Sequence, residues 1–270
     1  MPVELIALDL DDTLLRTDLT ISAVNLAALA EVSAAGIRIV LASGRNIHSM
    51  RDYAKLLGLD GPDDYLICSN GAETLEAATG RVLDERRLEP AFCVEIAQAI
   101  ETHGFPWQIY EHGCIQVSRP SRWALQDGRL SGLPVILLED KQAAFAEGLV
   151  KFVIPGEPDA IEALRPQLKK LFAGRAEVFT SKPYFLEVLA LGVDKGAALG
   201  RLAASLGISM ERVMAMGDAM NDLGMVGAAG HGSAPANAVP AVKAAARHVS
   251  AFTNDQDAVA DLVRRVALSR

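Results

Sequence analysis

The stretch LIALDLDDT, residues 5–13, is an apolar run that ends in closely spaced carboxylates. Residues 5–8 are typical of a buried strand, and Asp9 and Asp11 follow at once. Strand side chains alternate with period two, so these two acids would leave on the same side, roughly 6.6 Å apart if the chain stays extended. Such a pair can hold a divalent cation beside a phosphate while one acid attacks phosphorus and the other moves a proton. Taken alone, the motif fits a capped turn equally well.

The first third of the chain alternates strands and helices. Strands are expected near residues 4–8, 37–41 and 65–68, with a helix starting at Ser22 and another over residues 47–57. After Asp194 the same alternation returns, with a helix over 195–206, a strand over 213–216 and helices over 222–229, 238–246 and 258–267. Apolar strands separated by helices indicate a parallel sheet covered on both faces. We therefore predict an α/β fold with a Rossmann-like, three-layer core.

The middle of the chain has a different pattern. From residue 84 to residue 189 the expected strands are shorter, less apolar and interrupted by Gly and Pro, with helices near 91–103 and 160–172. This pattern predicts an α+β unit inserted into the first fold. The expected division is a core made of residues 1–83 and 190–270, with an inserted domain over residues 84–189.

Charge and composition exclude some classes of partner. The chain has 270 residues, 34 of them acidic and 26 basic, and a net charge of −8. The basic residues are scattered and aromatic residues make up only 5%, so binding of nucleic acid is not expected. An acidic protein that handles anionic substrates needs local cations, so we expect a bound metal or a few specific Lys and Arg side chains.

Cysteine use and hydropathy bear on the compartment. Cys68, Cys93 and Cys114 are widely spaced and form no CxxC pair, which fits buried thiols in a reducing cytosol. The N-terminus lacks a basic segment before its first strand, and no uncharged apolar run reaches the length of a membrane span. We expect a cytoplasmic protein without a membrane partner, and the sequence leaves its oligomeric state open.

Four segments carry candidate chemistry, each at the end of an expected strand or the start of a helix. They are Asp9-x-Asp11, then Ser43-Gly44 in LASGR, then Lys195 in GVDKG, and finally Asp218, Asn221 and Asp222 in GDAMND. Each fits an ordinary N-cap, surface lysine or capped turn when it is taken singly. Their shared position at the strand ends favours a common ligand-binding site, because ligands bind at the carboxyl ends of strands in open α/β sheets.

The sequence resembles a known family in these same segments. ALDLDDTLL (7–15), LASGR (41–45), SNGA (69–72), FLEVLALGVDKG (185–196) and MGDAMNDLGM (216–225) are similar to the motifs of haloacid-dehalogenase-type phosphatases, in particular the Cof-type subgroup, which has a large cap between the second and third motifs. One departure is Asp12, which stands where Gly is common. Asp tolerates the left-handed backbone region better than most residues, so the turn is expected to survive.

The resemblance implies a Mg²⁺-dependent phosphatase that hydrolyses small phosphorylated metabolites, sugar phosphates or similar monoesters, through an aspartyl-phosphate. It makes Asp9 the nucleophile and Asp11 the group that protonates the leaving oxygen and later deprotonates water. The implied metal ligands are the Asp9 side chain, the Asp11 main-chain carbonyl and Asp218, with Asp222 in support. The groups implied to bind the transferring phosphoryl are Ser43, the Gly44 N–H, Lys195 and Asn221.

The proton-carrying role places a demand on Asp11. A free Asp has a pKa near 3.9, so at pH 7 only roughly one in a thousand carries a proton. Asp11 would therefore need a raised pKa, from burial or from a neighbouring carboxylate.

Two other functions remain open on the sequence. A phosphomutase or phosphotransferase would form the same aspartyl-phosphate and discharge it to a hydroxyl group. A non-catalytic protein that binds phosphorylated metabolites could instead regulate a partner, although every expected catalytic side chain is present.

Overall fold

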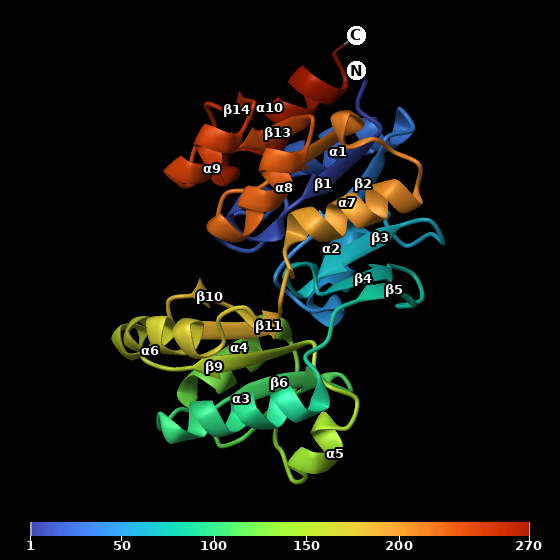
Figure 1. Cartoon of the computed structure of the whole chain (residues 1–270). Coiled ribbons are helices and arrows are strands. Elements are labelled where there is room, and N and C mark those ends of the chain that lie inside the picture. Colours follow the sequence, from blue (N-terminus) through green and yellow to red (C-terminus); the bar gives the residue numbers. More distant parts are fainter. Residues whose placement is uncertain (1, 270) are drawn as a thin grey trace. The chain divides into compact units, whose positions relative to one another are not determined.

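The computed structural model describes residues 2–269, and their contacts divide the chain into two compact units (Figure 1). The core unit contains the residues up to Asp84 together with those from Asp194 onward. The inserted unit contains Glu85–Val193. The unit that carries the four candidate segments is therefore assembled from the two ends of the sequence.

The core unit is built on one eight-stranded sheet. Its strands, in spatial order, are β14 (His248–Val249), β13 (His231–Ala234), β12 (Val213–Met216), β1 (Leu5–Leu8), β2 (Arg38–Ala42), β3 (Tyr65–Cys68), β4 (Glu73–Glu76) and β5 (Val82–Glu85). The pairs from β14 to β3 are parallel, whereas β3 and β4 are antiparallel. In this register Leu8 lies beside both Leu41 of β2 and Met216 of β12, so three strands end at the same level.

Helices cover both faces of this sheet, which confirms the predicted three-layer α/β core (Figure 1). On one face Ile6 and Leu8 pack with side chains of α1 (Ala23–Ala34), α2 (Ile47–Leu56) and α10 (Ala258–Leu262). On the other face Leu5 and Ala7 pack with α7 (Lys195–Ser205), α8 (Leu223–Ala228) and α9 (Pro240–Ala245). The alternation along β1 explains why this strand is apolar throughout, since both of its faces are buried.

The inserted unit is an α+β structure with its own six-stranded sheet and its own core. Its strands, in spatial order, are β10 (Ala176–Lys182), β11 (Phe185–Ala190), β9 (Lys151–Pro155), β6 (Gln108–Glu111), β7 (Cys114–Val117) and β8 (Val135–Leu137). Its helices are α3 (Pro90–Thr102), α4 (Arg122–Ser131), α5 (Lys141–Phe145) and α6 (Pro158–Leu171). The neighbouring strands are antiparallel except β7 and β8.

Several elements differ from the sequence expectation. Strand β13 was not predicted, because His-Gly-Ser-Ala lacks the β-branched and aromatic residues that mark strands. A Cβ on Gly232 would lie 2.0 Å from the Val226 carbonyl oxygen, so the small residue allows α8 to pack closely. The β4–β5 hairpin and α4 were also unpredicted. The expected last helix over 258–267 ends as α10 at Leu262 and continues as a wider turn over Val263–Ala267.

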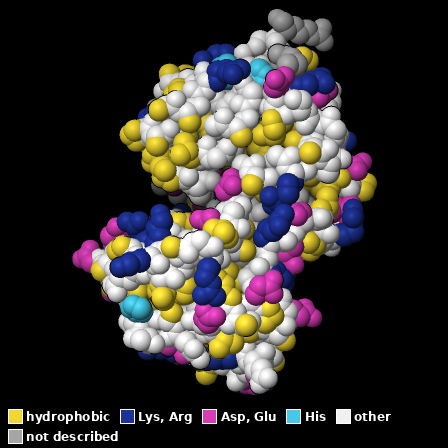
Figure 2. Space-filling model, viewed as in Figure 1, with side chains coloured by type: hydrophobic (Ala, Val, Ile, Leu, Met, Phe, Trp, Pro, Cys, Tyr) yellow, Lys and Arg dark blue, Asp and Glu magenta, His cyan; other side chains and the backbone are white. Residues whose placement is uncertain are grey.

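The surface carries charges of both signs. On the face drawn in Figure 2, Lys and Arg side chains lie interspersed with Asp and Glu side chains, and apolar atoms are scattered between them. Among residues 2–269, none of the helices has the length and apolar character needed to cross a membrane.

Candidate active site

The candidate site lies at the carboxyl edge of the core sheet. Asp9 follows β1, Ser43 follows β2 and Asp218 follows β12, and these three strands are neighbours. The Asp9 N–H continues the sheet ladder by donating to the Met216 carbonyl oxygen at 3.0 Å. The parallel sheet thus brings three of the four sequence segments to one edge, although more than 200 residues separate the first from the last.

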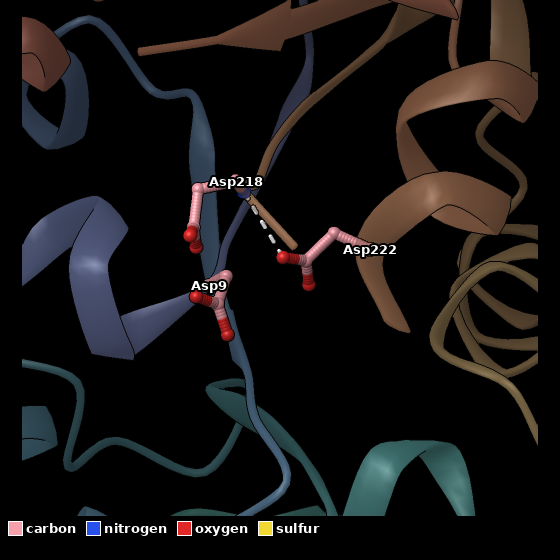
Figure 3. Close-up of side chains that lie close together, drawn as sticks. All are labelled: Asp9, Asp218 and Asp222. Carbon is pink, nitrogen blue, oxygen red and sulfur yellow. Dashed lines mark hydrogen bonds between the residues drawn. The ribbon is translucent and has the colours of Figure 1, made fainter. Parts of the chain in front are cut away.

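Three carboxylates meet at this edge. Oxygens of Asp9, Asp218 and Asp222 lie within 4.8 Å of one another, and Figure 3 shows the Asp9 and Asp218 carboxylates side by side, with that of Asp222 opposite them. Asp222 Oδ2 accepts hydrogen bonds from the N–H groups of Asp218 and Ala219, both at 3.0 Å. A Cβ on Gly217 would lie 2.3 Å from the Asp222 Cβ, so this tight turn requires glycine. The turn after β12 is therefore built to present two acids toward Asp9.

Lys195 lies inside the carboxylate cluster. Its Nζ is 2.6 Å from Oδ1 of Asp9 and 2.6 Å from Oδ1 of Asp222, and its side chain is fully buried. Burial opposes its charge, but Asp222 and Asp9 outweigh that penalty and raise the Lys195 pKa. Lys195 is the first residue of α7, which Asp194 caps by accepting from the N–H groups of Gly196 and Ala197. The cap fixes where the lysine side chain starts.

The single positive charge of Lys195 does not balance the negative charges of the three carboxylates. Burial, and next the charge of Asp222, raise the Asp9 pKa well above its usual value. The same two causes raise the pKa of Asp218 to about 7. The three carboxylates are oxygen donors suited to a hard divalent cation such as Mg²⁺, and the charge of such an ion would favour the ionised forms of Asp9 and Asp218. The donor set found here fits such an ion.

The turn after β1 also contributes to the site. Asp12 has a φ of 59°, in the left-handed region, so the expectation that Asp can replace Gly here is confirmed. The turn brings Thr13 Oγ1 to 3.1 Å from Asp218 Oδ1, to which it donates a hydrogen bond. Thr13 was quoted only as part of its motif, and its contact with Asp218, 205 residues away, depends on the sheet order.

Asp11 has a different environment from the one expected. Its carboxylate forms a two-point ion pair with Arg45, whose Nε donates to Oδ2 at 2.9 Å and whose Nη2 donates to Oδ1 at 2.7 Å. A guanidinium favours the ionised carboxylate, whereas burial or a second carboxylate would favour the protonated acid. The observed partner of Asp11 is thus a cation, and the role of Asp11 as the proton donor stays a prediction. The sequence reasoning gave Arg45 no role, although it follows Ser43 and Gly44 at the strand end.

The predicted phosphate-binding residues lie together with the turn Ser69–Gly71. The Ser43 side chain is buried, and its Oγ accepts from the Arg45 N–H at 3.2 Å. Asn221 Nδ2 donates to Asn70 Oδ1 at 3.0 Å. The Asn70 amide also lies against Gly44, where a Cβ would be 3.0 Å from its Nδ2. Asn70 was quoted within SNGA without a role, and its position shows that this segment also belongs to the site.

Comparisons with known proteins agree with this geometry. The sequence profile of the haloacid dehalogenase-like hydrolases matches residues 6–263. A Streptococcus pyogenes protein named "Putative phosphatase" is 27% identical over 273 residues, covering 100% of both chains. A haloacid dehalogenase-like hydrolase from Bacteroides thetaiotaomicron has a similar crystal structure, with a TM-score of 0.90 and 29% identity over 98% of this chain and 99% of that one. A Thermotoga maritima crystal structure has a TM-score of 0.86 and 27% identity over 98% and 97%. The chain thus belongs to the haloacid dehalogenase-like hydrolase family.

Proposed function

We propose that this hydrolase is a Mg²⁺-dependent phosphatase that cleaves small phosphorylated metabolites, sugar phosphates or similar monoesters, through an aspartyl-phosphate on Asp9. The observation that carries the proposal is the position of Asp9. Its carboxylate lies at the carboxyl edge of the sheet, beside two further acids and in contact with the buried Lys195. A nucleophile surrounded by cation-binding groups is what phosphoryl transfer requires, because that reaction depends on positioning and charge neutralisation.

In this proposal the metal would be held by the side chains of Asp9 and Asp218 and by the main-chain carbonyl of Asp11, with Asp222 in support. When bound, Mg²⁺ supplies positive charge that offsets the carboxylates and the phosphate oxygens. The clustering of three carboxylates, together with the raised pKa values of Asp9 and Asp218, supports this assignment.

The chemical steps use the chain's own residues. An oxygen of the ionised Asp9 attacks phosphorus, the bond from phosphorus to the leaving oxygen breaks, and Asp11 gives that oxygen a proton. A water molecule then attacks phosphorus while Asp11 takes one of its protons. The bond from Asp9 to phosphorus breaks, inorganic phosphate leaves and both acids return to their starting states. Ser43, the Gly44 N–H, Lys195 and Asn221 orient the phosphoryl group.

This scheme requires a change at Asp11. Because Arg45 holds both of its oxygens, Asp11 must loosen this ion pair before it can carry a proton to the leaving group. We propose that substrate binding loosens the pair, since a phosphate monoester offers Arg45 another anion.

We further propose that the inserted domain, residues 84–189, acts as a cap that sets the choice of substrate. Its separate sheet and core support this role. A unit that folds around its own core can change in sequence without disturbing the candidate site at the carboxyl edge of the core sheet.

The test is hydrolysis of p-nitrophenyl phosphate with Mg²⁺. We expect Asp9→Asn to lower kcat by at least about a thousandfold with unchanged thermal unfolding, since a carboxamide is a poor nucleophile. The matched control is Asp52→Asn on α2, where the side chain is exposed and activity should be retained. Full activity of Asp9→Asn would rule out the nucleophile, and full activity after chelator treatment would rule out the metal requirement.

Product analysis separates the alternative reaction. A phosphatase releases inorganic phosphate in step with the alcohol, whereas a phosphotransferase given an acceptor sugar releases the alcohol without equivalent phosphate. We expect one phosphate per alcohol whether or not glucose is present as an acceptor.

A further inference from the structure

The turn Ser69–Gly71, between β3 and β4, has an unusual backbone. Its three residues have φ values of 51°, 58° and 95°, all in the left-handed region. For Ser69 and Asn70, which carry a Cβ, this conformation costs roughly 1–2 kcal/mol each. Both side chains are also buried, with 2% of their surface exposed. A strained, buried polar turn persists only where its surroundings hold it in place.

Both neighbouring segments of the site hold this turn. The Ser69 N–H donates to the Arg45 carbonyl oxygen at 2.9 Å, and the Asn70 N–H donates to the Ser43 carbonyl oxygen at 3.0 Å. On the other side, a Cβ on Gly71 would lie only 2.4 Å from the Asp194 carbonyl oxygen. The turn therefore lies between the loop after β2 and the start of α7, which carry Ser43 and Lys195.

The Asn70 side chain connects two of the predicted phosphate-binding groups. Its Oδ1 accepts from Nδ2 of Asn221 at 3.0 Å, and its amide lies against Gly44. A carboxamide nitrogen carries two hydrogens in one plane. Once the first is bound to Asn70, the plane and direction of the second are set as well. Asn70 can thus orient the donor that Asn221 offers without contacting the ligand itself.

We infer that Asn70 is a positioning residue that holds the Asn221 amide and the Gly44 main chain in the geometry that binds the transferring phosphoryl group. The inference rests on the proposed function and deepens it, because it assigns a task to a segment that the mechanism leaves unused. The strain of the turn then has a function, because this backbone places the Asn70 amide between the two segments.

The first test is Asn70→Gly, assayed with p-nitrophenyl phosphate and Mg²⁺. Glycine keeps the left-handed turn and removes only the amide, so we expect thermal unfolding to change little. We expect kcat to fall by about 10- to 100-fold, because a misplaced donor weakens transition-state binding. The control is Leu19→Gly, which replaces another left-handed residue, one that is 38% exposed, and should keep kcat within twofold. A folded Asn70→Gly protein with wild-type kcat would overturn the inference.

The second test is a double-mutant cycle with Asn221→Ala. If Asn70 acts through Asn221, adding Asn70→Gly to Asn221→Ala should lower kcat by less than about threefold. A purely structural turn would give two losses that multiply, and this outcome would also overturn the inference. Asn70→Asp, which keeps the acceptor oxygen and the side-chain size, serves as a second variant. The loss of kcat in Asn70→Asp combined with Asn221→Ala should again be smaller than the product of the two single losses, even where the added charge raises KM.

Binding of inorganic phosphate tests the same point without turnover. Calorimetry with Mg²⁺ present should show at least about tenfold weaker phosphate binding by Asn70→Gly than by wild type, and an equal Kd would contradict the inference. The two proposals can fail separately. A wild-type protein that binds phosphate but hydrolyses nothing would refute the phosphatase, while the Kd comparison would still decide the role of Asn70.

Discussion

Lys195 Nζ lies 2.6 Å from Oδ1 of Asp9 in a region where neither side chain is exposed. The two residues are 186 positions apart, one before and one after the inserted unit in the sequence. Removing a cation from a buried carboxylate cluster leaves charge that water cannot reach. We therefore expect Lys195 to serve the stability of the fold as well as the proposed chemistry.

Lys195→Met should lower the free energy of unfolding by about 3–5 kcal/mol in chelator, because it leaves Asp9 and Asp222 without their partner. Added Mg²⁺ should restore more stability to this variant than to wild type, since the ion then compensates the carboxylates alone. Urea unfolding with and without Mg²⁺ measures both effects. Lys55→Met, on the exposed surface of α2, is the control and should change stability by less than about 0.5 kcal/mol. An equally stable Lys195→Met protein would contradict the prediction.

The stability of the metal-free protein should depend on the titration of Asp218. Its pKa is raised to about 7 in the folded protein, chiefly by burial, whereas the unfolded chain releases this proton near pH 4. Between these pH values the folded state binds more protons, so the contribution of this group is complete below pH 4 and is lost as pH rises toward 7. The slope from one group is at most about 1.4 kcal/mol per pH unit, and Asp218 should give less because it is half-buried.

The measurement is urea unfolding in chelator from pH 5.5 to 8. The difference in free energy between Asp218→Asn and wild type isolates this group from all others that titrate. We expect the free energy of unfolding of Asp218→Asn to rise relative to that of wild type as pH rises. The stabilisation of wild type by Mg²⁺ should grow over the same range. A difference that is independent of pH would show that Asp218 titrates normally.

Arg45→Gln should shift the pH profile of hydrolysis. Removing the guanidinium disfavours the ionised form of Asp11, so the basic limb of kcat/KM should move up by about one pH unit. Arg201→Gln is the matched control, because Arg201 forms an ion pair with Asp84 at 2.8 Å in the same unit. It should leave the profile in place. A change in KM with an unmoved basic limb would mean that Arg45 binds the substrate and leaves Asp11 unaffected.

Two glycines of α7 give a paired test of packing at the site. A Cβ on Gly196 would lie 2.5 Å from the main chain of Gly224, whereas one on Gly200 would meet nothing within 4 Å. Gly200→Ala should therefore stabilise the protein by up to about 1 kcal/mol through helix propensity, with unchanged activity. Gly196→Ala should destabilise it by about 1–3 kcal/mol and lower kcat, since it pushes the start of α7 away from Asp222. Thermal unfolding and the p-nitrophenyl phosphate assay compare the two, and equal effects would exclude the packing argument.

The strands next to the site were predictable because they are strongly apolar. The carboxyl ends of β1 and β12 lie where they were expected, directly before Asp9 and Gly217. β13 could not be predicted, because its Gly232 is explained by the close approach of α8 rather than by strand propensity. The sharp boundaries place the candidate residues at one edge even before any contact is known.

The contacts of Asp11 and Asn70 depend on the fold. Both residues stand in motifs that the sequence displays, but their partners, Arg45 and Asn221, lie 34 and 151 positions away. Which side chains pair across such separations depends on strand order, on positive φ values and on glycines that allow close approach. Periodicity and spacing describe only the local chain, so they identify the acids and their shared edge. The ion pair on Asp11, and the lysine between Asp9 and Asp222, arise only when distant segments pack together and exclude water.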